Sequence, residues 1–160
     1  MTKYDVTVYD VTIYDVNSPF LIRHCLDTEM KDLEMKFWTT LPNFFLVATR
    51  GNNVVGIVAI QKKADKLAEL NRFAVAPEAR GLGVGKALVE AAISRSRQLG
   101  YGSIYLATGQ VRKTAMRLYE RVGFKLIGEY SGKIIFFIPV PSSFHGIAVR
   151  EYLYNIEDTS

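Results

Sequence analysis

The sequence predicts one domain, residues 1–160, of mixed α/β (α+β) class. Two apolar segments rich in β-branched residues, 44–49 and 54–60, flank the turn Arg50-Gly51-Asn52-Asn53, and this pattern is typical of a β-hairpin. Strand-like and helix-like segments alternate along the rest of the chain. With 160 residues, of which 49% are hydrophobic and 22% charged, the chain can bury one sizeable core but is too short for two domains.

The N-terminal part is predicted to form a strand followed by a helix. Residues 4–16 nearly repeat a five-residue unit three times, and their β-branched and aromatic side chains favour a strand. Asn17 or Ser18 before Pro19 is typical of a helix start, and apolar residues then recur at helical spacing. We therefore expect a helix over residues 20–37.

The middle of the chain is predicted to contain two strands and two helices. After a polar link over 61–66, the elements in order are a strand over 67–76, a helix over 84–99 that ends at Gly100, a strand over 103–108 and a helix over 111–122. Because side chains alternate along a strand, the odd-numbered residues of the first of these strands are expected to share one face: Glu69, Asn71, Phe73 and Val75.

The C-terminal part is predicted to add two strands, over 125–130 and 147–156, after a turn at Gly123 and Phe124. Between these strands, residues 134–141 form an apolar run that ends in prolines and is too short to cross a membrane. Three interpretations stay open for this run: a buried strand, a cover over a binding pocket, or a subunit contact.

The most informative stretch is the glycine-rich turn Arg80-Gly81-Leu82-Gly83-Val84-Gly85-Lys86, between a predicted strand and a predicted helix. Its glycines let a ligand approach the backbone, and the helix that follows directs unpaired N–H groups into the turn, which suits a phosphate. A Walker loop is excluded, because Arg80 and Ala87 stand where that motif needs a glycine and a Ser or Thr. A dinucleotide fold is disfavoured, because residues 104–107 offer no acidic side chain for a ribose.

The pattern Arg80-x-x-Gly83-x-Gly85 resembles the pyrophosphate loop of the GNAT superfamily of N-acetyltransferases. Residues 115–125, Ala-Met-Arg-Leu-Tyr-Glu-Arg-Val-Gly-Phe-Lys, resemble a later helix and turn of the same superfamily. With Thr108-Gly109-Gln110 ahead of them, the likeness is greatest to the camello-type N-acetyltransferases and covers roughly residues 44–156. That subgroup usually carries an apolar membrane hairpin before its catalytic domain, and we expect none in this sequence.

The resemblance implies a GNAT fold, whose central, mostly antiparallel twisted sheet is splayed between the fourth and fifth strands and flanked by helices. It also implies acetyl-CoA as co-substrate. Its pyrophosphate would bind the N–H groups of residues 82–86 near the charge of Arg80, and its pantetheine arm would pair with the backbone of the preceding strand. Arg112 stands where most members have a coenzyme-contacting asparagine. The implied coenzyme-binding residues are Ala74, Val75, Arg80, Gly81, Leu82, Gly83, Val84, Gly85, Lys86 and Arg112.

The resemblance further implies direct transfer of the acetyl group to a primary amine. Glu69 would take the proton of the amine, and its alternative is a solvated or ion-paired carboxylate. Tyr119 would protonate the departing thiolate, and its alternative is a ring that only packs. The N–H of Val75 would stabilise the oxyanion. No covalent enzyme intermediate is expected, because Cys25 and the serines have no evident base partner.

Composition limits the other classes of partner. The formal charge of +4 is spread along the chain without a dense basic tract, so we expect no nucleic acid. The single cysteine, Cys25, excludes an internal disulfide and a cysteine-based metal cluster, and we expect no metal site. The sequence shows neither a long apolar run nor a secretory signal, which predicts a cytoplasmic protein without a membrane partner. A homodimer is compatible with this fold.

The acceptor stays open between a small-molecule and a peptide amine. Specificity is expected to depend on residues 20–45 and 133–145, and the first of these holds aromatic residues that either line a pocket or form core: Phe37, Trp38, Phe44 and Phe45. Three cationic residues favour an anionic amine: Arg72, Arg112 and Lys113. The alternatives to an acetyltransferase are an idle coenzyme A sensor, a transferase for longer acyl groups and an interaction module.

Overall fold

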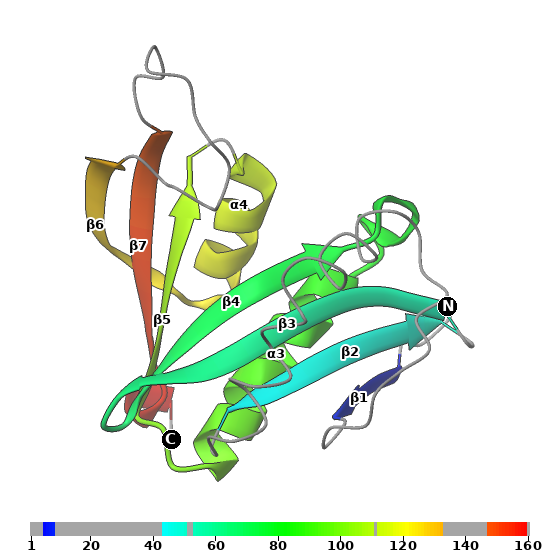
Figure 1. Ribbon diagram of the computed structural model, residues 1–160, viewed down its shortest axis with the longest axis horizontal. Coiled ribbons are helices and arrows are strands. Elements are labelled where there is room, and N and C mark those ends of the chain that lie inside the picture. Colours follow the sequence, from blue (N-terminus) through cyan, green and yellow to red (C-terminus); the bar gives the residue numbers. More distant parts are fainter. Residues whose placement is uncertain (1–4, 9–42, 51–52, 111, 133–146, 160) are drawn as a thin grey trace.

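The computed structural model describes residues 5–8, 43–50, 53–110, 112–132 and 147–159. Within these residues, seven strands form one sheet in the order β1-β2-β3-β4-β5-β7-β6 (Figure 1). All neighbouring strands are antiparallel except β4 and β5, which are parallel. The strands are β1 (Asp5–Val8), β2 (Phe44–Arg50), β3 (Asn53–Ala64), β4 (Leu67–Val75), β5 (Ser103–Gly109), β6 (Lys125–Gly132) and β7 (Ile147–Asn155). The predicted mixed α/β class with a mostly antiparallel sheet is confirmed.

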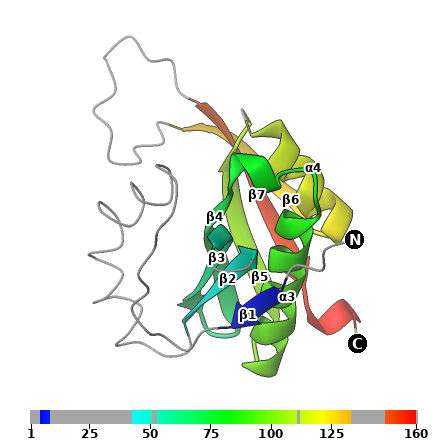
Figure 2. The ribbon, with the colours of Figure 1, turned by 90° about the vertical axis from the view of Figure 1, so that its right-hand side faces the viewer.

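Two α-helices, α3 (Val84–Gln98) and α4 (Lys113–Val122), cover one face of this sheet (Figure 2). Short 3₁₀ helices follow β4 and β7, at Pro77–Ala79 and Glu157–Thr159. A cluster of buried side chains fills the space between helices and sheet and includes Leu46, Val58, Ile60, Leu88 and Ile104. In the part of the chain that the structure describes, no helix has both the length and the apolar character that a membrane crossing requires.

Helix α3 packs closely on β3 because Gly56 has no side chain. A Cβ at Gly56 would lie 2.8 Å from Leu88 Cδ1 and 3.2 Å from Val84 Cγ1. Gly56 is also paired with Val75, the last residue of β4. The close contact therefore holds the start of α3 beside the end of β4. The helix ends as the sequence predicts, because Gly100 has a φ of +84°.

The sheet divides between β4 and β5. The two strands pair only from Leu67, opposite Ser103, to Glu69, opposite Tyr105. Beyond these pairs they diverge, and β4 stays with β3 while β5 stays with β7, so that the sheet has the shape of a V in Figure 1. The predicted splay between the fourth and fifth strands is confirmed. The consequence is an unpaired inner edge on each strand beyond Glu69 and Tyr105.

A β-bulge in β4 corrects one prediction. Opposite the single residue Val58 of β3, strand β4 has two residues, Arg72 and Phe73, and Arg72 has a φ of +50°. The extra residue reverses the alternation of side chains. Before the bulge the even-numbered Ala68 and Leu70 face the helices, and after it the odd-numbered Phe73 and Val75 do. The expectation that Glu69, Asn71, Phe73 and Val75 share one face was therefore wrong.

Several element boundaries also differ from expectation. The polar link predicted over 61–66 is mostly strand, because β3 continues to Ala64 in an antiparallel hairpin with β4. Its polarity reflects exposure rather than a loop, since residues 62–66 are all exposed. The tight turn between the two strands holds Lys66 at a φ of +56°. Helix α4 begins at Lys113 with Arg112 as its N-cap, and residue 111 lies outside the described residues.

Other predictions fall partly or wholly outside the described part of the chain. Of the strand predicted over 4–16, residues 5–8 form β1. The helix predicted over 20–37 and the apolar run 134–141 lie outside the described residues, as do Cys25, Phe37 and Trp38.

Candidate functional site

The turn between β4 and α3 presents free backbone N–H groups to solvent. Residues 80–83 are exposed, and Gly81 and Gly83 have φ values of +73° and +85°, with open space where a side chain would begin. The first hydrogen bond of α3 runs from the N–H of Ala87 to the carbonyl of Gly83 at 3.0 Å. The N–H groups of residues 84–86 therefore have no acceptor within the helix. The first turn of α3 carries no acidic residue, which leaves the positive end of the helix dipole open to an anion.

Gly85 has a different role from the two glycines before it. A Cβ at Gly85 would lie 3.1 Å from Phe73 Cζ and 3.2 Å from Leu118 Cδ2. The residue is thus the point at which α3, α4 and β4 approach one another closely. The sequence motif treats the three glycines alike, whereas the structure uses Gly81 and Gly83 for backbone conformation and Gly85 for packing.

The charged residues of the turn differ in their contacts. Arg80 is exposed, and its Nε donates a hydrogen bond to the carbonyl of Val75 at 3.2 Å. The side chain of Arg80 therefore crosses back from the turn to the end of β4. Lys86 is exposed and lies 3.6 Å from the carboxylate of Glu90, one helical turn further on.

The inner edge of β4 carries main-chain groups that pair with no other strand, next to this turn. The N–H of Ala76 donates to the carbonyl of Val55 on β3 at 2.8 Å. Successive residues of a strand direct their N–H and C=O groups to opposite sides. The main-chain groups of Val75 therefore point away from β3, into the splay, and those of Ala74 point toward β3.

Tyr119 lies in the core between α4 and the sheet, with 4% of its surface exposed. Its ring packs against Phe73, Phe124 and Tyr152 at centroid distances of 5.8, 5.7 and 6.4 Å. Burial raises the pKa of the Tyr119 hydroxyl far above its usual range, and the positive charge of Arg112 opposes that shift. The hydroxyl is therefore protonated at neutral pH, in the form that can donate a proton.

Glu69 belongs to a polar cluster at the point where β4 and β5 separate. Its carboxylate lies 3.3 Å from Lys63 Nζ, and this ammonium is also 4.3 Å from the centre of the Tyr105 ring. The hydroxyl of Tyr105 donates a short hydrogen bond to the carboxylate of Glu151 on β7. Sequence reasoning anticipated an ion-paired carboxylate as one alternative for Glu69. It missed Tyr105 and Glu151, since only the pairing of β4, β5 and β7 brings them beside Glu69.

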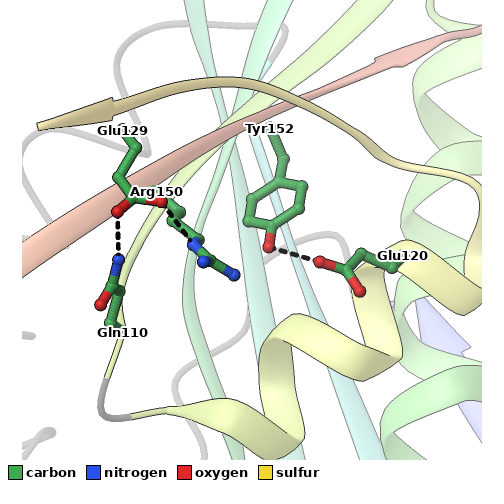
Figure 3. Close-up of polar contacts among 5 residues, drawn as sticks. All are labelled: Gln110, Glu120, Glu129, Arg150 and Tyr152. Atoms are coloured by element: carbon green, nitrogen blue, oxygen red, sulfur yellow. Dashed lines mark hydrogen bonds and ion pairs between the residues drawn. The ribbon is translucent and has the colours of Figure 1, made fainter.

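A second polar network joins α4 to the C-terminal strands (Figure 3). Glu129 on β6 accepts hydrogen bonds from the side chains of Gln110 and Arg150, at 2.6 and 2.9 Å, and Tyr152 donates to Glu120 at 2.8 Å. Nearby is a hollow of about 280 Å³ lined by Gln110, Lys113, Met116, Arg117, Glu120 and Arg150. No local motif indicated this network, because its members come from α4, β6, β7 and the residue that follows β5.

The structure brings together most of the predicted site residues. The glycine-rich turn, the start of α3 and the free edge at Val75 are contiguous, and Phe73 connects Gly85 to Tyr119. Glu69 is separate from these groups, at the closed end of the splay and on the face opposite the helices. A donor bound over α3 and an acceptor bound beside Glu69 would therefore approach the splay from opposite faces of the sheet.

Comparison with known proteins agrees with this geometry. The sequence profile of the acetyltransferase (GNAT) family matches residues 11–124. Mouse N-acetyltransferase 8 is 34% identical over 113 residues, which are 68% of this chain and 50% of the mouse protein. Zebrafish N-acetylaspartate synthetase is 37% identical over 105 residues, 65% of this chain and 37% of that protein. The chain thus spans about half the length of the relatives it matches, and the likeness to N-acetyltransferase 8 confirms the camello-type resemblance.

Solved structures show the same fold. A Bacillus subtilis acetyltransferase in complex with CoA has a TM-score of 0.72 at 17% identity, and the alignment covers 96% of this chain and 99% of that one. The fold agrees with the sequence match, because both indicate the same family of proteins. The features that agree are the order of the strands, the splay and the glycine-rich turn. The chain therefore belongs to the GNAT acetyltransferase family.

Proposed function

We propose that residues 1–160 form a single N-acetyltransferase domain that transfers an acetyl group from acetyl-CoA to a primary amine. The observation that supports this most strongly is the continuity between two sets of backbone groups that have no partner within the sheet or the helix. The free edge of β4 at Val75 leads through the turn 80–83 into the unpaired N–H groups at the start of α3. An amide-rich arm attached to a pyrophosphate has the chemistry that such a surface pairs with.

In this proposal the coenzyme lies along the inner edge of β4. Its pyrophosphate binds the N–H groups of residues 82–86, and Gly81 and Gly83 supply the backbone conformation of that turn. Arg80 and Lys86 add positive charge beside the pyrophosphate, and Arg112 adds charge at the start of α4. The pantetheine arm donates a hydrogen bond to the carbonyl of Val75, which leaves the Val75 N–H for the thioester oxygen. Ala74 supports that edge through its own pairing with β3.

The chemical step would be a direct transfer. The lone pair of the amine attacks the carbonyl carbon of the thioester. The proton that the amine gives up passes through water to Glu69, because Glu69 stands six positions before Val75 on β4. The N–H of Val75 stabilises the negative charge on the carbonyl oxygen. The carbon–sulfur bond then breaks, and Tyr119 gives its proton to the thiolate. The balance is one acetyl group moved, one proton taken by Glu69 and one delivered by Tyr119.

The relatives support the proposal in two ways. Mouse N-acetyltransferase 8 carries this activity in its name, and zebrafish N-acetylaspartate synthetase is named for an N-acetylated product. The Bacillus subtilis structure, which shares the fold, was solved in complex with CoA. Because the match covers only 50% and 37% of the two named relatives, their acceptors are not transferred to this chain.

The test is release of free CoA thiol from acetyl-CoA in the presence of a panel of primary amines. We expect turnover with at least one amine, and a loss of about a hundredfold in kcat for Tyr119→Phe and for Glu69→Gln, the range typical of general acid–base catalysis. Tyr154→Phe is the matched control, because the Tyr154 ring packs against Phe124 as the Tyr119 ring does, and Tyr154 is not among the proposed site residues. Full coenzyme binding with no turnover on any amine would contradict the proposal and favour a coenzyme A sensor.

A further inference from the structure

The polar cluster at the vertex of the splay already holds one ammonium group. Lys63 Nζ lies 3.3 Å from the carboxylate of Glu69 and 4.3 Å from the centre of the Tyr105 ring. A carboxylate beside an aromatic face is a combination that binds alkylammonium ions. The contacts of Lys63 therefore show that this position accepts a primary ammonium.

The cluster also has more negative than positive charge. Glu69 and Glu151 are two carboxylates around Tyr105, and Lys63 is the one cation among these four described side chains. Gly128 makes room for Glu151, because a Cβ at Gly128 would lie 2.8 Å from Glu151 Oε2. These four groups together carry a net charge of −1, so a second cation is favoured beside them.

Tyr105 is a neutral hydrogen-bond donor within this cluster. Burial, the hydrogen bond to Glu151 and the charges of Glu151 and Glu69 all raise the pKa of its hydroxyl. The hydroxyl thus stays protonated and keeps donating to Glu151, which fixes that carboxylate next to the ring. Tyr105 and Glu69 are also the last pair of residues that join β4 to β5, so the cluster lies where the two strands begin to separate.

Lys63 is suited to leave this position. Its side chain is 40% exposed and flexible, and an exposed ion pair contributes little to stability. The incoming ligand gains the same carboxylate and the same aromatic face that Lys63 leaves. Exchange of one ammonium for the other therefore has a small net cost.

We propose that Glu69, Glu151 and the Tyr105 ring form the subsite for the ammonium group of the acceptor, and that Lys63 occupies this subsite in the free protein. This inference rests on the proposed function and names its substrate class: a primary alkylammonium without a carboxylate next to the amine. Such an acceptor displaces Lys63 and gives one proton to Glu69, which releases it to solvent. The neutral amine then attacks the thioester, and the second proton that its nitrogen loses passes through water to Glu69. An α-amino acid is disfavoured, because the negative charge of its own carboxylate is repelled by Glu69 and Glu151.

This substrate class differs from the anionic amine that Arg72, Arg112 and Lys113 favour in the sequence. All three residues are exposed, and Arg112 and Lys113 lie at the start of α4, on the face of the sheet that the helices cover. The structure thus places these two cations on the face opposite the two carboxylates at the vertex.

Two matched probes test the subsite by NMR titration: phenethylammonium, and phenylalanine, which adds a carboxylate next to the same amine. Dissociation constants are measured for the protein alone and for its complex with CoA, which carries no acetyl group to transfer. We expect phenethylammonium to bind at least about tenfold more tightly than phenylalanine. In Lys63→Met, phenethylammonium should bind about fivefold more tightly, the size expected when a competing exposed ion pair and cation–π contact are removed.

Two further variants make the result specific. Glu151→Gln, which keeps an acceptor for the Tyr105 hydroxyl, should weaken the binding of phenethylammonium about fivefold. Lys62→Met, at an exposed neighbouring lysine, should leave this affinity unchanged. Equal affinity in Lys63→Met and wild type, or tighter binding of phenylalanine, would overturn the subsite. Failure of CoA to bind would instead refute the proposed function. The titration of the protein without CoA would still show whether the subsite binds an ammonium.

Discussion

Deletion of Arg72 tests whether the bulge in β4 positions the functional edge of that strand. Without the extra residue, the strict alternation of a strand moves every side chain on one side of position 72 to the opposite face of the sheet. Either Phe73 and Val75 leave the helix face, or Ala68 and Leu70 do. In the first case Phe73 loses its contact with the Tyr119 ring and its place above Gly85.

The magnitude follows from the burial of these side chains. Removing a partly buried phenylalanine from its core site costs about 3 kcal/mol, and removing a valine about 1.5 kcal/mol. A loss of roughly 4.5 kcal/mol is a large share of the 5–15 kcal/mol that typically stabilises a domain. We therefore expect the deletion variant to unfold at a much lower urea concentration than the wild type, followed by far-UV circular dichroism.

The control is Arg72→Asn, which keeps the number of residues in β4. Asparagine tolerates the left-handed conformation that Arg72 adopts at a φ of +50°. Its unfolding free energy should lie within about 1 kcal/mol of the wild type. If the deletion variant is as stable as Arg72→Asn, the bulge does not determine which face Phe73 occupies, and the reasoning is refuted.

Two further predictions concern Tyr119 and Gly85. Burial raises the pKa of Tyr119 in the folded protein above the value of about 10 in the unfolded chain. The contribution of Tyr119 to the unfolding free energy is therefore fully present below pH 10. Above pH 10 the unfolding free energy falls by up to about 1.4 kcal/mol per pH unit. Urea titrations at pH 9 and pH 11 should show a smaller fall for Tyr119→Phe, and an identical fall would count against burial as the cause. Gly85→Leu should destabilise the fold by about 2 kcal/mol in the same assay, because even a Cβ there would lie 3.1 Å from Phe73 and 3.2 Å from Leu118. An unchanged midpoint would show that α3, α4 and β4 do not pack closely at this point.

The elements that the sequence predicts well are those with strong local signals. The hairpin of β2 and β3, helix α3 with Gly100 after it, and strand β5 depend on apolar patterns and turn residues within a few positions. The glycine-rich turn is also a local signal, since the conformations of Gly81 and Gly83 and the start of α3 follow from consecutive residues.

The features that the sequence does not reveal depend on contacts between distant segments. Arg72 adopts a left-handed conformation although it is not a glycine, and only its pairing with β3 shows that a residue is inserted there. The association of Tyr105 with Glu151 requires the register of β5 against β7. The packing role of Gly85 requires the position of α4. In each case the determining partner is too far along the chain for a local pattern to indicate it.

The central claim is that the start of α3 binds the pyrophosphate of the coenzyme, and calorimetric titration with acetyl-CoA tests it most directly. Gly83 and Gly100 form a matched pair at the two ends of α3, with φ values of +85° and +84° and open space around each. Their aspartate variants carry the same backbone strain, and only Gly83→Asp places a negative charge at the proposed phosphate site. We predict binding by wild type and Gly100→Asp, with a loss of at least about tenfold in Gly83→Asp. Equal affinity in all three proteins, or no binding by the wild type, would contradict the claim.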